Sequence, residues 1–382
     1  MKKILILFLS ILLIACSPTT NIELIDKNEK FKLNNQSHLQ SHNFKIDAKD
    51  FSNLGIDTTV IGIDDNYCYI DYQKNSIHNY YKVNLKDQSK KLFYQLKDLS
   101  GDEGFVFTKQ IMSDHSLIIA YDDRTCGKIV EIDTHTGKEN VLFSSQQSSW
   151  IDIVINNKDS IIIHNIDNVK RKNQEIGQII EIRKSDKQSK TLCQYEAFYN
   201  EEKNTYNGEV IGAVGSLDDN SFVLAHTLLK DESLSVDNTG KTSIGFYDLK
   251  EDKFEDLFEY TYSVDQLYGN KDVMFVADYR VTNDDIVTKK VILNENKKYH
   301  VYSLDEPNVY SHYRVSLLDN QLIYGKNDEG KLKIYDLKNH NYNTYALFKV
   351  KDDNYDTIHV FNKKIYHVSY DQKTINIKQY DK

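Results

Sequence analysis

The sequence contains few of the residues on which helical proteins depend. Its 382 residues include 2 prolines, 15 glycines, one tryptophan and eight alanines. Alanine is the best helix former, so its scarcity argues against a helical or α/β protein. The chain has 27 tyrosines, and tyrosine suits the pleated surface of a strand. Its length allows two or three domains or one large β domain, and the composition favours β-structure.

The chain also lacks a basic run. Its formal net charge is -9 at pH 7, with 48 Lys and Arg against 57 Asp and Glu. A nucleic-acid backbone would be repelled by this average charge. We therefore expect no nucleic-acid partner.

Familiar catalytic motifs are absent from the sequence. There is no HExxH, GxSxG or glycine-rich phosphate loop, so no catalytic residue, metal ligand or cofactor is predicted. Asp-Asp-Asn runs at 64–66, 218–220 and 352–354 suggest calcium, but they lack the dense ligand pattern of a calcium loop. Tight polar turns are the favoured interpretation.

The first 16 residues have the pattern of an export signal. Lys2 and Lys3 precede an apolar run from Ile4 to Ile14 that only Ser10 interrupts. The run is too short for a comfortable membrane span. It ends in Leu-Ile-Ala-Cys, which resembles the lipobox of bacterial lipoproteins. An ordinary signal peptide with a chance cysteine, or a short membrane anchor, remains the alternative.

The lipobox resemblance implies a processed and anchored protein. Residues 1–15 would be removed and Cys16 would carry the lipid, which places the protein on the extracytoplasmic face of the cell membrane. Residues 16–40 are mostly polar without a sustained period, and we expect a flexible tether. An odd number of cysteines remains (Cys68, Cys126 and Cys193), so buried free thiols are expected.

Two repeating patterns run through the rest of the chain. One is a polar pair before an apolar run, as in Asp65-Asn66 before YCYID. The other is an apolar strand ending in Asn or Asp, as in YKVNL. Each occurs in seven units, and the spacings lie between about 42 and 65 residues. Repeats of this length indicate solenoids or propellers.

Each unit has the pattern of four short strands. In the second unit we expect strands at 104–112, 116–121, 128–133 and 139–144. The motifs DHSLIIA, VEID and TGK of this unit resemble bacterial β-propellers of the YVTN, TolB and quinoprotein-like kind. We therefore expect residues 41–382 to form one all-β propeller, most simply with seven four-stranded blades, with six or eight as alternatives. The seventh unit stops after its third strand, so the alternating segment 42–47 is expected to close the ring.

One position near the end of the second strand is polar in every unit. It is occupied by Tyr72, Tyr121, Asn165, His226, Asp278, Lys326 and Ser369. Strand ends and neighbouring loops share one face of a propeller, so the first six form a candidate binding face. Polar residues where a strand meets solvent give an equally simple explanation.

Three connections between the second and third strands are long. They cover 165–177, 226–241 and 279–287, whereas the other units have short connections. Long loops in a compact domain are usually functional or disordered. Three neighbouring insertions predict a recognition surface.

These patterns favour a monomeric, membrane-anchored propeller that binds a protein or another component of the envelope. The alternative is a propeller hydrolase or lyase acting on envelope glycan or peptide, since propeller active sites are dispersed in sequence. A transporter-type solute-binding lipoprotein would need alternating strands and helices, which are missing.

Overall fold

The structure is a computed structural model of the whole chain. The residues that it describes are 24–36, 41–75, 77–97, 106–113, 115–122, 126–146, 148–169, 173–232, 241–261, 263–280, 286–304, 315–326, 331–346, 356–361, 364–371 and 373–380. All regular structure in these ranges is β-strand. No helix within them has the length and apolar character needed to cross a membrane.

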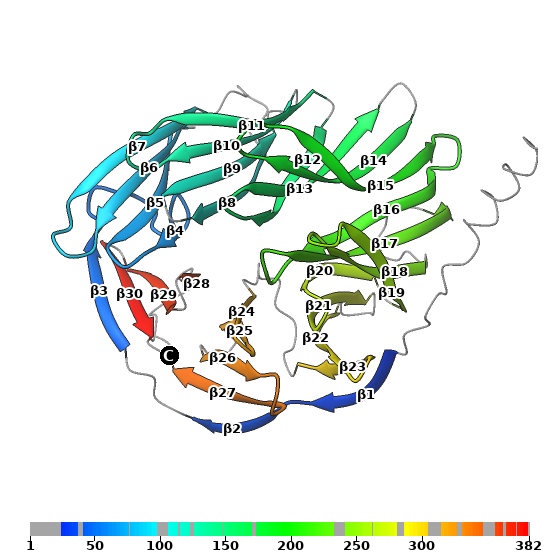
Figure 1. Cartoon of the computed structure of the whole chain (residues 1–382). Helices are drawn as coiled ribbons and strands as arrows, with labels where there is room; N and C mark the ends of the chain where they lie inside the picture. The colour runs from blue at the N-terminus through cyan, green and yellow to red at the C-terminus, as the bar shows by residue number, and fades with distance from the viewer. Residues whose placement is uncertain are drawn as a thin grey trace, which may run out of the picture.

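The described strands form six sheets arranged around a common axis, which is the architecture of a β-propeller (Figure 1). Strands from β4 onward that are consecutive within a sheet pair antiparallel, and β1, β2 and β3 are added to the ends of three sheets. The predicted all-β propeller fold is therefore confirmed. Successive side chains of a strand point to opposite faces of its sheet. Apolar side chains on these faces allow neighbouring sheets to pack face to face.

The first three sheets follow the chain in simple order. The first contains β4 (Thr58–Ile63), β5 (Tyr67–Lys74), β6 (Ile77–Asn84) and β7 (Lys90–Lys97). The second contains β8 (Val106–Ser113), β9 (Ser116–Asp122), β10 (Gly127–Asp133) and β11 (Glu139–Ser145), close to the predicted ranges. The third has eight strands: β12 (Ser148–Asn156), β13 (Ser160–Val169), β14 (Gln174–Arg183), β15 (Ser189–Asn200), β16 (Thr205–Gly215), β17 (Ser221–Glu232), β18 (Lys241–Asp248) and β19 (Lys253–Tyr260).

Each of the other three sheets includes a strand from the N-terminal region. The fourth contains β20 (Ser263–Gly269), β21 (Val273–Arg280), β22 (Ile286–Glu295), β23 (Lys298–Ser303) and β1 (Leu24–Lys30). The fifth contains β24 (Ser316–Leu318), β25 (Gln321–Lys326), β26 (Lys331–Asp336), β27 (Asn341–Ala346) and β2 (Lys32–Gln36). The sixth contains β28 (Asp356–Phe361), β29 (Lys364–Asp371), β30 (Thr374–Tyr380) and β3 (Ser41–Asp47).

The sheet count corrects the expectation of seven separate four-stranded blades. Five sheets have the four or five strands of a blade, and the third sheet has eight. The cause is direct pairing of β15 with β16, from Ala197 opposite Gly208 to Asn200 opposite Thr205. A tight turn joins two strands that the repeat pattern had assigned to separate blades.

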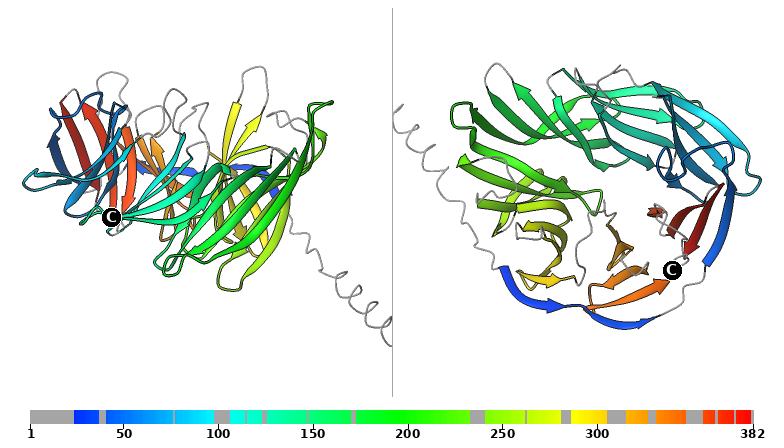
Figure 2. Two further views of the ribbon diagram at one scale, coloured as in Figure 1. Left: turned by 90° about the horizontal axis from the view of Figure 1, so that it is seen from above. Right: turned by 180° about the vertical axis from the view of Figure 1, so that it is seen from behind.

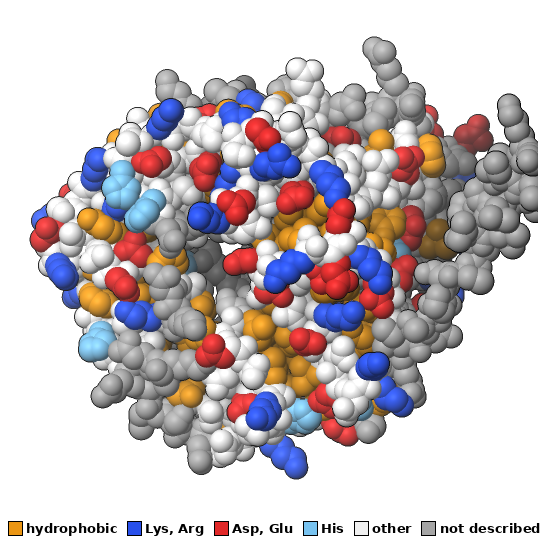
Figure 3. All heavy atoms as spheres, viewed as in Figure 1, with side chains coloured by type: hydrophobic (Ala, Val, Ile, Leu, Met, Phe, Trp, Pro, Cys, Tyr) orange, Lys and Arg blue, Asp and Glu red, His pale blue; other side chains and the backbone are white. Residues whose placement is uncertain are grey.

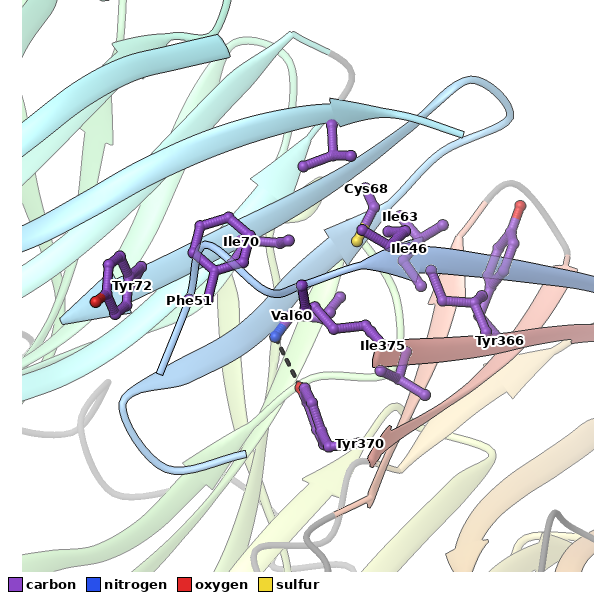
Figure 4. Close-up of a cluster of buried hydrophobic side chains, with 14 residues drawn as sticks. Ile46, Phe51, Val60, Ile63, Cys68, Ile70, Tyr72, Tyr366, Tyr370 and Ile375 are labelled. Carbon is purple, nitrogen blue, oxygen red and sulfur yellow. Dashed lines mark hydrogen bonds between the residues drawn. The ribbon is translucent and has the colours of Figure 1, made fainter. Parts of the chain in front are cut away.

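The predicted closure of the ring by residues 42–47 is confirmed. Strand β3 pairs with β30 in register, from Ser41 opposite Tyr380 to Asp47 opposite Thr374. A buried cluster around Ile46, Val60 and Ile375 then joins the first and last sheets (Figure 4). The amide of Val60 donates to the Tyr370 hydroxyl at 2.8 Å, which satisfies a buried donor at the closure.

The expected flexible tether is wrong for residues 24–36. Strand β1 pairs parallel to β23 and β2 pairs parallel to β27, so this segment runs along the outer rim of two sheets (Figures 1 and 2). We call residues 24–36 the strap. Its backbone pairs with regular strand edges, which a search for side-chain periodicity does not detect. The predicted signal peptide and Cys16 lie outside the described residues.

The outer strands differ in whether their pairing with the preceding strand contains a bulge. In β7, β11, β15 and β19 the pairing with the preceding strand shifts by one residue. The extra residues in the outer strands are Phe93, Leu142, Leu192 and Leu257. Strands β23 and β27 pair without a shift, and these are the two strands that the strap covers. Bulges are one way in which proteins protect an exposed sheet edge.

The three long connections are shorter than expected. Residues 165–169 continue β13 and pair with 174–178 of β14, so the first of them is a hairpin of long strands. Residues 226–232 similarly belong to β17. Cross-strand hydrogen bonding continues through these polar residues. The remaining parts, 170–172, 233–240 and 281–285, lie outside the described residues, as does the Asp-Asp-Asn run at 352–354.

Candidate functional site

The polar position shared by the repeats is buried rather than exposed. Side chains of Tyr72, Tyr121, Asn165, His226 and Asp278 are all buried, and Ser369 is buried too. Lys326 belongs to β25, and its side chain lies outside the described part of the chain. The alternative of polar groups at a solvent boundary is therefore not supported for the described residues of this set.

These side chains lie between neighbouring four-strand units. The Tyr260 hydroxyl of β19 donates to Asp278 of β21 at 2.9 Å. The Tyr195 ring of β15 stacks on His226 of β17, with ring centroids 4.8 Å apart. Tyr121 packs in a cluster with residues of the first sheet. Tyr72, Tyr121 and Asp278 thus lie in three different sheets, and the structure does not gather the six candidates into one site.

The most polar of these environments surrounds His226. Its Nδ1 contacts Glu209 of β16, and its Nε2 lies 2.8 Å from Asp256 Oδ1 of β19. Together with Tyr195, these residues form what we call the His226 cluster. It lies where β15 and β16 diverge, because their pairing ends at Ala197 and Gly208.

The two carboxylates decide the charge of the imidazole. A neutral imidazole has one N–H, so only the imidazolium can donate to both carboxylates at once. Burial lowers the pKa of His226, but the hydrogen bonds that the imidazolium donates to Asp256 and Glu209 raise it by more, so the net pKa lies above the ordinary value. The burial of Tyr195 raises the pKa of its phenol, so it faces the ring as a neutral side chain.

The cluster is open to solvent on one side. The exposed fractions of the side chains are 60% for Asp256, 35% for Glu209 and 8% for His226. A buried cation held by exposed carboxylates can exchange a proton with solvent. It can also present negative charge to a basic group of a partner.

Exposed apolar side chains lie beside the cluster. Leu228 is directly opposite Glu209 in the β16–β17 register, and Phe198 lies at the far end of β15. Phe198 is 50% exposed and Leu228 38% exposed. Figure 3 shows hydrophobic side chains exposed among Lys, Arg, Asp and Glu side chains on one face of the ring. This combination of apolar and acidic groups suits recognition more than solubility alone.

Two hollows occur elsewhere on the described surface. A cavity of about 630 Å³ is lined by Tyr72 together with Ser52, Asp57 and Lys74. Another of about 470 Å³ lies between the fourth and fifth sheets, with Leu293, Glu295, Leu317 and His340 among its lining residues. Neither of them includes a residue of the His226 cluster.

A buried ion pair lies one unit further along the ring. Lys290 Nζ is 2.7 Å from Asp278 Oδ2, and both side chains are almost fully buried. Lys290 also lies 3.2 Å from the Tyr260 hydroxyl. This network joins β19 to β21 and β22 across the packing interface, and we interpret it as structural.

Metal ligation is not indicated by the described residues. No group of three or more His, Cys, Asp or Glu side chains among them could hold a metal ion. In the Asp-Asp-Asn runs, Asp64 Oδ1 accepts the amides of Asn66 and Tyr67, and Asp218 Oδ1 accepts the amide of Asn220. These are polar turns. Cys68 and Cys193 are buried free thiols, and the burial of Cys193 raises its pKa to about 12.

Sequence reasoning identified His226 but none of its partners. Tyr195, Glu209 and Asp256 lie on three other strands, and they are not distinguished from the many other polar residues of the chain. The one-residue shift in β19, which places Asp256 opposite Gly245, is visible only in the folded structure.

Comparisons with known proteins support the fold. No protein-family model matches the chain, and no curated protein matches its sequence. Its structure is similar to oligogalacturonate lyase in complex with manganese, with a TM-score of 0.54 and 10% identity over 94% of this chain and 99% of that chain. It is also similar to a prolyl endopeptidase, with a TM-score of 0.51 and 9% identity over 87% of this chain and 45% of that one.

A third similarity is to the β-propeller domain of the Trilobed protease from Pyrococcus furiosus. The TM-score is 0.50 with 9% identity, over 86% of this chain and 95% of that chain. Identities this low carry information about the fold alone. The chain therefore has a β-propeller fold, which these proteins of different activities share.

Proposed function

We propose that this protein is a membrane-anchored, extracytoplasmic β-propeller lipoprotein that binds a protein or envelope ligand. The observation that carries the binding role is the His226 cluster beside exposed Phe198 and Leu228. Apolar side chains rimmed by acidic groups suit a ligand with both apolar and basic groups. The eight-stranded sheet holds all of them on one rigid scaffold.

The anchoring role rests on the lipobox. Leu13 to Cys16 has the pattern of a lipidation site, and the first described strand begins at Leu24. Eight residues span at most about 29 Å, so a lipid on Cys16 would hold the β23 side of the ring near the bilayer. Two acyl chains suffice for stable anchoring.

We further propose that the eight-stranded sheet acts as two blades, which gives seven sectors in all. A hydrophobic cluster that includes Ile162 and Phe222 packs β12–β15 against β16–β19. The two halves thus face each other as neighbouring blades do, although β15 and β16 remain paired at one end.

The anchor is tested by metabolic labelling with a fatty acid. We expect the wild type to incorporate label and Cys16→Ala to incorporate none. Labelling of the variant at the wild-type level would refute lipidation at this residue.

The binding surface is tested by substitution at Phe198 and Leu228. Replacing each by Asp should abolish capture of an envelope component that the wild type retains. Ile56 is 65% exposed outside the eight-stranded sheet, so Ile56→Asp is the matched control and should keep capture. If the Phe198→Asp and Leu228→Asp variants capture the component as well as Ile56→Asp and the wild type do, the binding site lies elsewhere.

The alternative is a propeller hydrolase or lyase acting on envelope glycan or peptide. The observation in its favour is an imidazole between two carboxylates, which can transfer a proton. Turnover of oligosaccharide or peptide substrates by the wild type, lost in His226→Gln, would favour this alternative.

A further inference from the structure

The outer edges of β23 and β27 are the regular edges that receive an added strand. Strap strand β1 pairs in parallel with β23, and β2 pairs in parallel with β27. Of the four outer strands with an extra residue, β7, β11 and β19 receive no further strand among the described residues. Strand β15 pairs antiparallel with β16, and only from Ala197 to Asn200, beyond its extra residue Leu192. A regular edge offers a row of N–H and C=O groups to an extended peptide.

An aromatic pocket lies between these two edges. Phe31, between β1 and β2, has its ring centroid 5.2 Å from that of Tyr302 and 5.2 Å from that of Tyr335. The His340 ring lies 6.2 Å away, and the His340 carbonyl accepts the amide of Lys32 at 3.1 Å. The pocket therefore selects an aromatic side chain at one position of an extended segment.

His340 also fixes the rim of the pocket. Its Nε2 lies 2.8 Å from Glu295 of β22. The Tyr302 hydroxyl donates to Glu295 at 3.1 Å. These contacts join the fourth and fifth sheets beside Phe31 and keep the pocket in shape.

The strap packs on the ring through few apolar side chains, chiefly Phe31, with Leu24 partly buried against a second core cluster. Phe31 is buried, whereas Leu33 is 54% exposed and Asp26, Lys30 and Lys32 are exposed. The pairing is parallel and irregular in both strands, with shifts between Asp26 and Glu29 and between Leu33 and Gln36. Segments with few buried contacts open locally at low free-energy cost.

We infer that the β23 and β27 edges with the Phe31 pocket form a peptide-binding site, and that it accepts the strap of a second copy of this chain in trans. The site is already shaped for this sequence, so a second copy supplies a ligand that fits it. Exchange of an identical element is a low-cost route to a dimer. The inference does not depend on lipidation or on the His226 cluster.

The test uses a fluorescent peptide with the sequence of residues 23–37 and the full chain. The variant Phe31→Ala loosens its own strap but keeps Tyr302 and Tyr335. We expect it to bind the peptide at least tenfold more tightly than the wild type, in which the strap competes. Leu33→Ala is the matched control in the same segment, and it should bind as the wild type does.

The peptide itself gives the second comparison. A peptide with Phe31→Ala should bind the loosened variant at least tenfold more weakly than one with Leu33→Ala. Equal binding of the two peptides, or no binding to a folded variant, would overturn the site. Peptide binding with no wild-type dimer in native mass spectrometry would overturn the second copy as the occupant.

Hydrogen exchange keeps the inference testable if Phe31→Ala does not fold. In the wild type, amides of the strap should exchange at least tenfold faster than those of β3, which pairs in unbroken register with β30. Equal protection of the two segments would show that the strap does not open, and would overturn the inference.

Discussion

We expect the His226 cluster to make the stability of the ring depend on pH. The pKa of His226 is raised in the folded protein, with Asp256 and Glu209 as the groups that raise it. Its stabilisation is therefore fully present below the unfolded pKa of about 6.5, and it is lost as pH rises through the higher folded value. We expect His226→Gln to remove this dependence, because glutamine does not titrate.

The change in the free energy of unfolding with pH has an upper bound. One group exchanges at most one proton on unfolding, so the free energy of unfolding can change by at most about 1.4 kcal/mol per pH unit. The assay is reversible urea unfolding of both proteins between about pH 5.5 and 9. The difference between the two free energies should be constant at the acid end and should shrink above about pH 6.5.

A carboxylate substitution provides the control. Glu209→Gln removes one of the groups that raise the pKa of His226, so the pH range over which stability is lost should become narrower. Asp256 remains at 2.8 Å as the other ion-pair partner. A difference between wild type and His226→Gln that stays constant or grows with pH would refute the assignment of an imidazolium to this cluster.

Two stability predictions concern the interfaces between neighbouring units. Lys290→Met should lower the free energy of unfolding by about 3–5 kcal/mol in urea titrations, because the buried Asp278 carboxylate loses its ammonium partner. Gly215→Ala should cost about 1–3 kcal/mol in the same assay, because the new Cβ would lie 2.2 Å from the Leu267 carbonyl oxygen of β20. Wild-type stability in either variant would contradict the corresponding packing.

The repeat pattern predicted the fold because the units share one strong physical signal. The second strand of each unit is an apolar run whose side chains pack on both faces of the sheet. Ile161, Ile162 and Ile163, for example, are fully buried. Polar turns bound these runs, so their spacing was readable. The closing strand was also predictable, since Phe44 and Ile46 alternate with polar residues.

The remaining features depend on backbone pairing, which leaves little trace in sequence. The strap has one buried aromatic residue, Phe31, among mainly polar residues. The β15–β16 junction requires only that two polar strand ends, near Asn200 and Thr205, meet across a turn. Strands β13 and β14 continue beyond Asn165 through polar residues, whose sequence is typical of a loop. In each case the backbone hydrogen bonds, rather than side-chain burial, decide the structure.

The candidate site shows the same limit at the level of single residues. His226 was identified because its position is polar in every unit, yet most equivalent residues serve packing between units. Asp278, for example, pairs with buried Lys290. His226 differs from Asp278 in that its carboxylate partners, Glu209 and Asp256, are exposed to solvent. The exposure of Glu209 on β16 and Asp256 on β19 is a property of the folded ring.

Four outer strands contain an extra residue, whereas β23 and β27, which receive the strap, contain none. An extra residue such as Leu142 in β11 turns two successive side chains toward the core and breaks the regular row of edge amides. Strands β23 and β27 lack it, so their edge amides keep the regular row that can receive a strand. The chain covers them with its own strap. A segment that protects an edge by occupying it is also a segment that another chain can replace, so protection and recognition at this rim have the same structural origin.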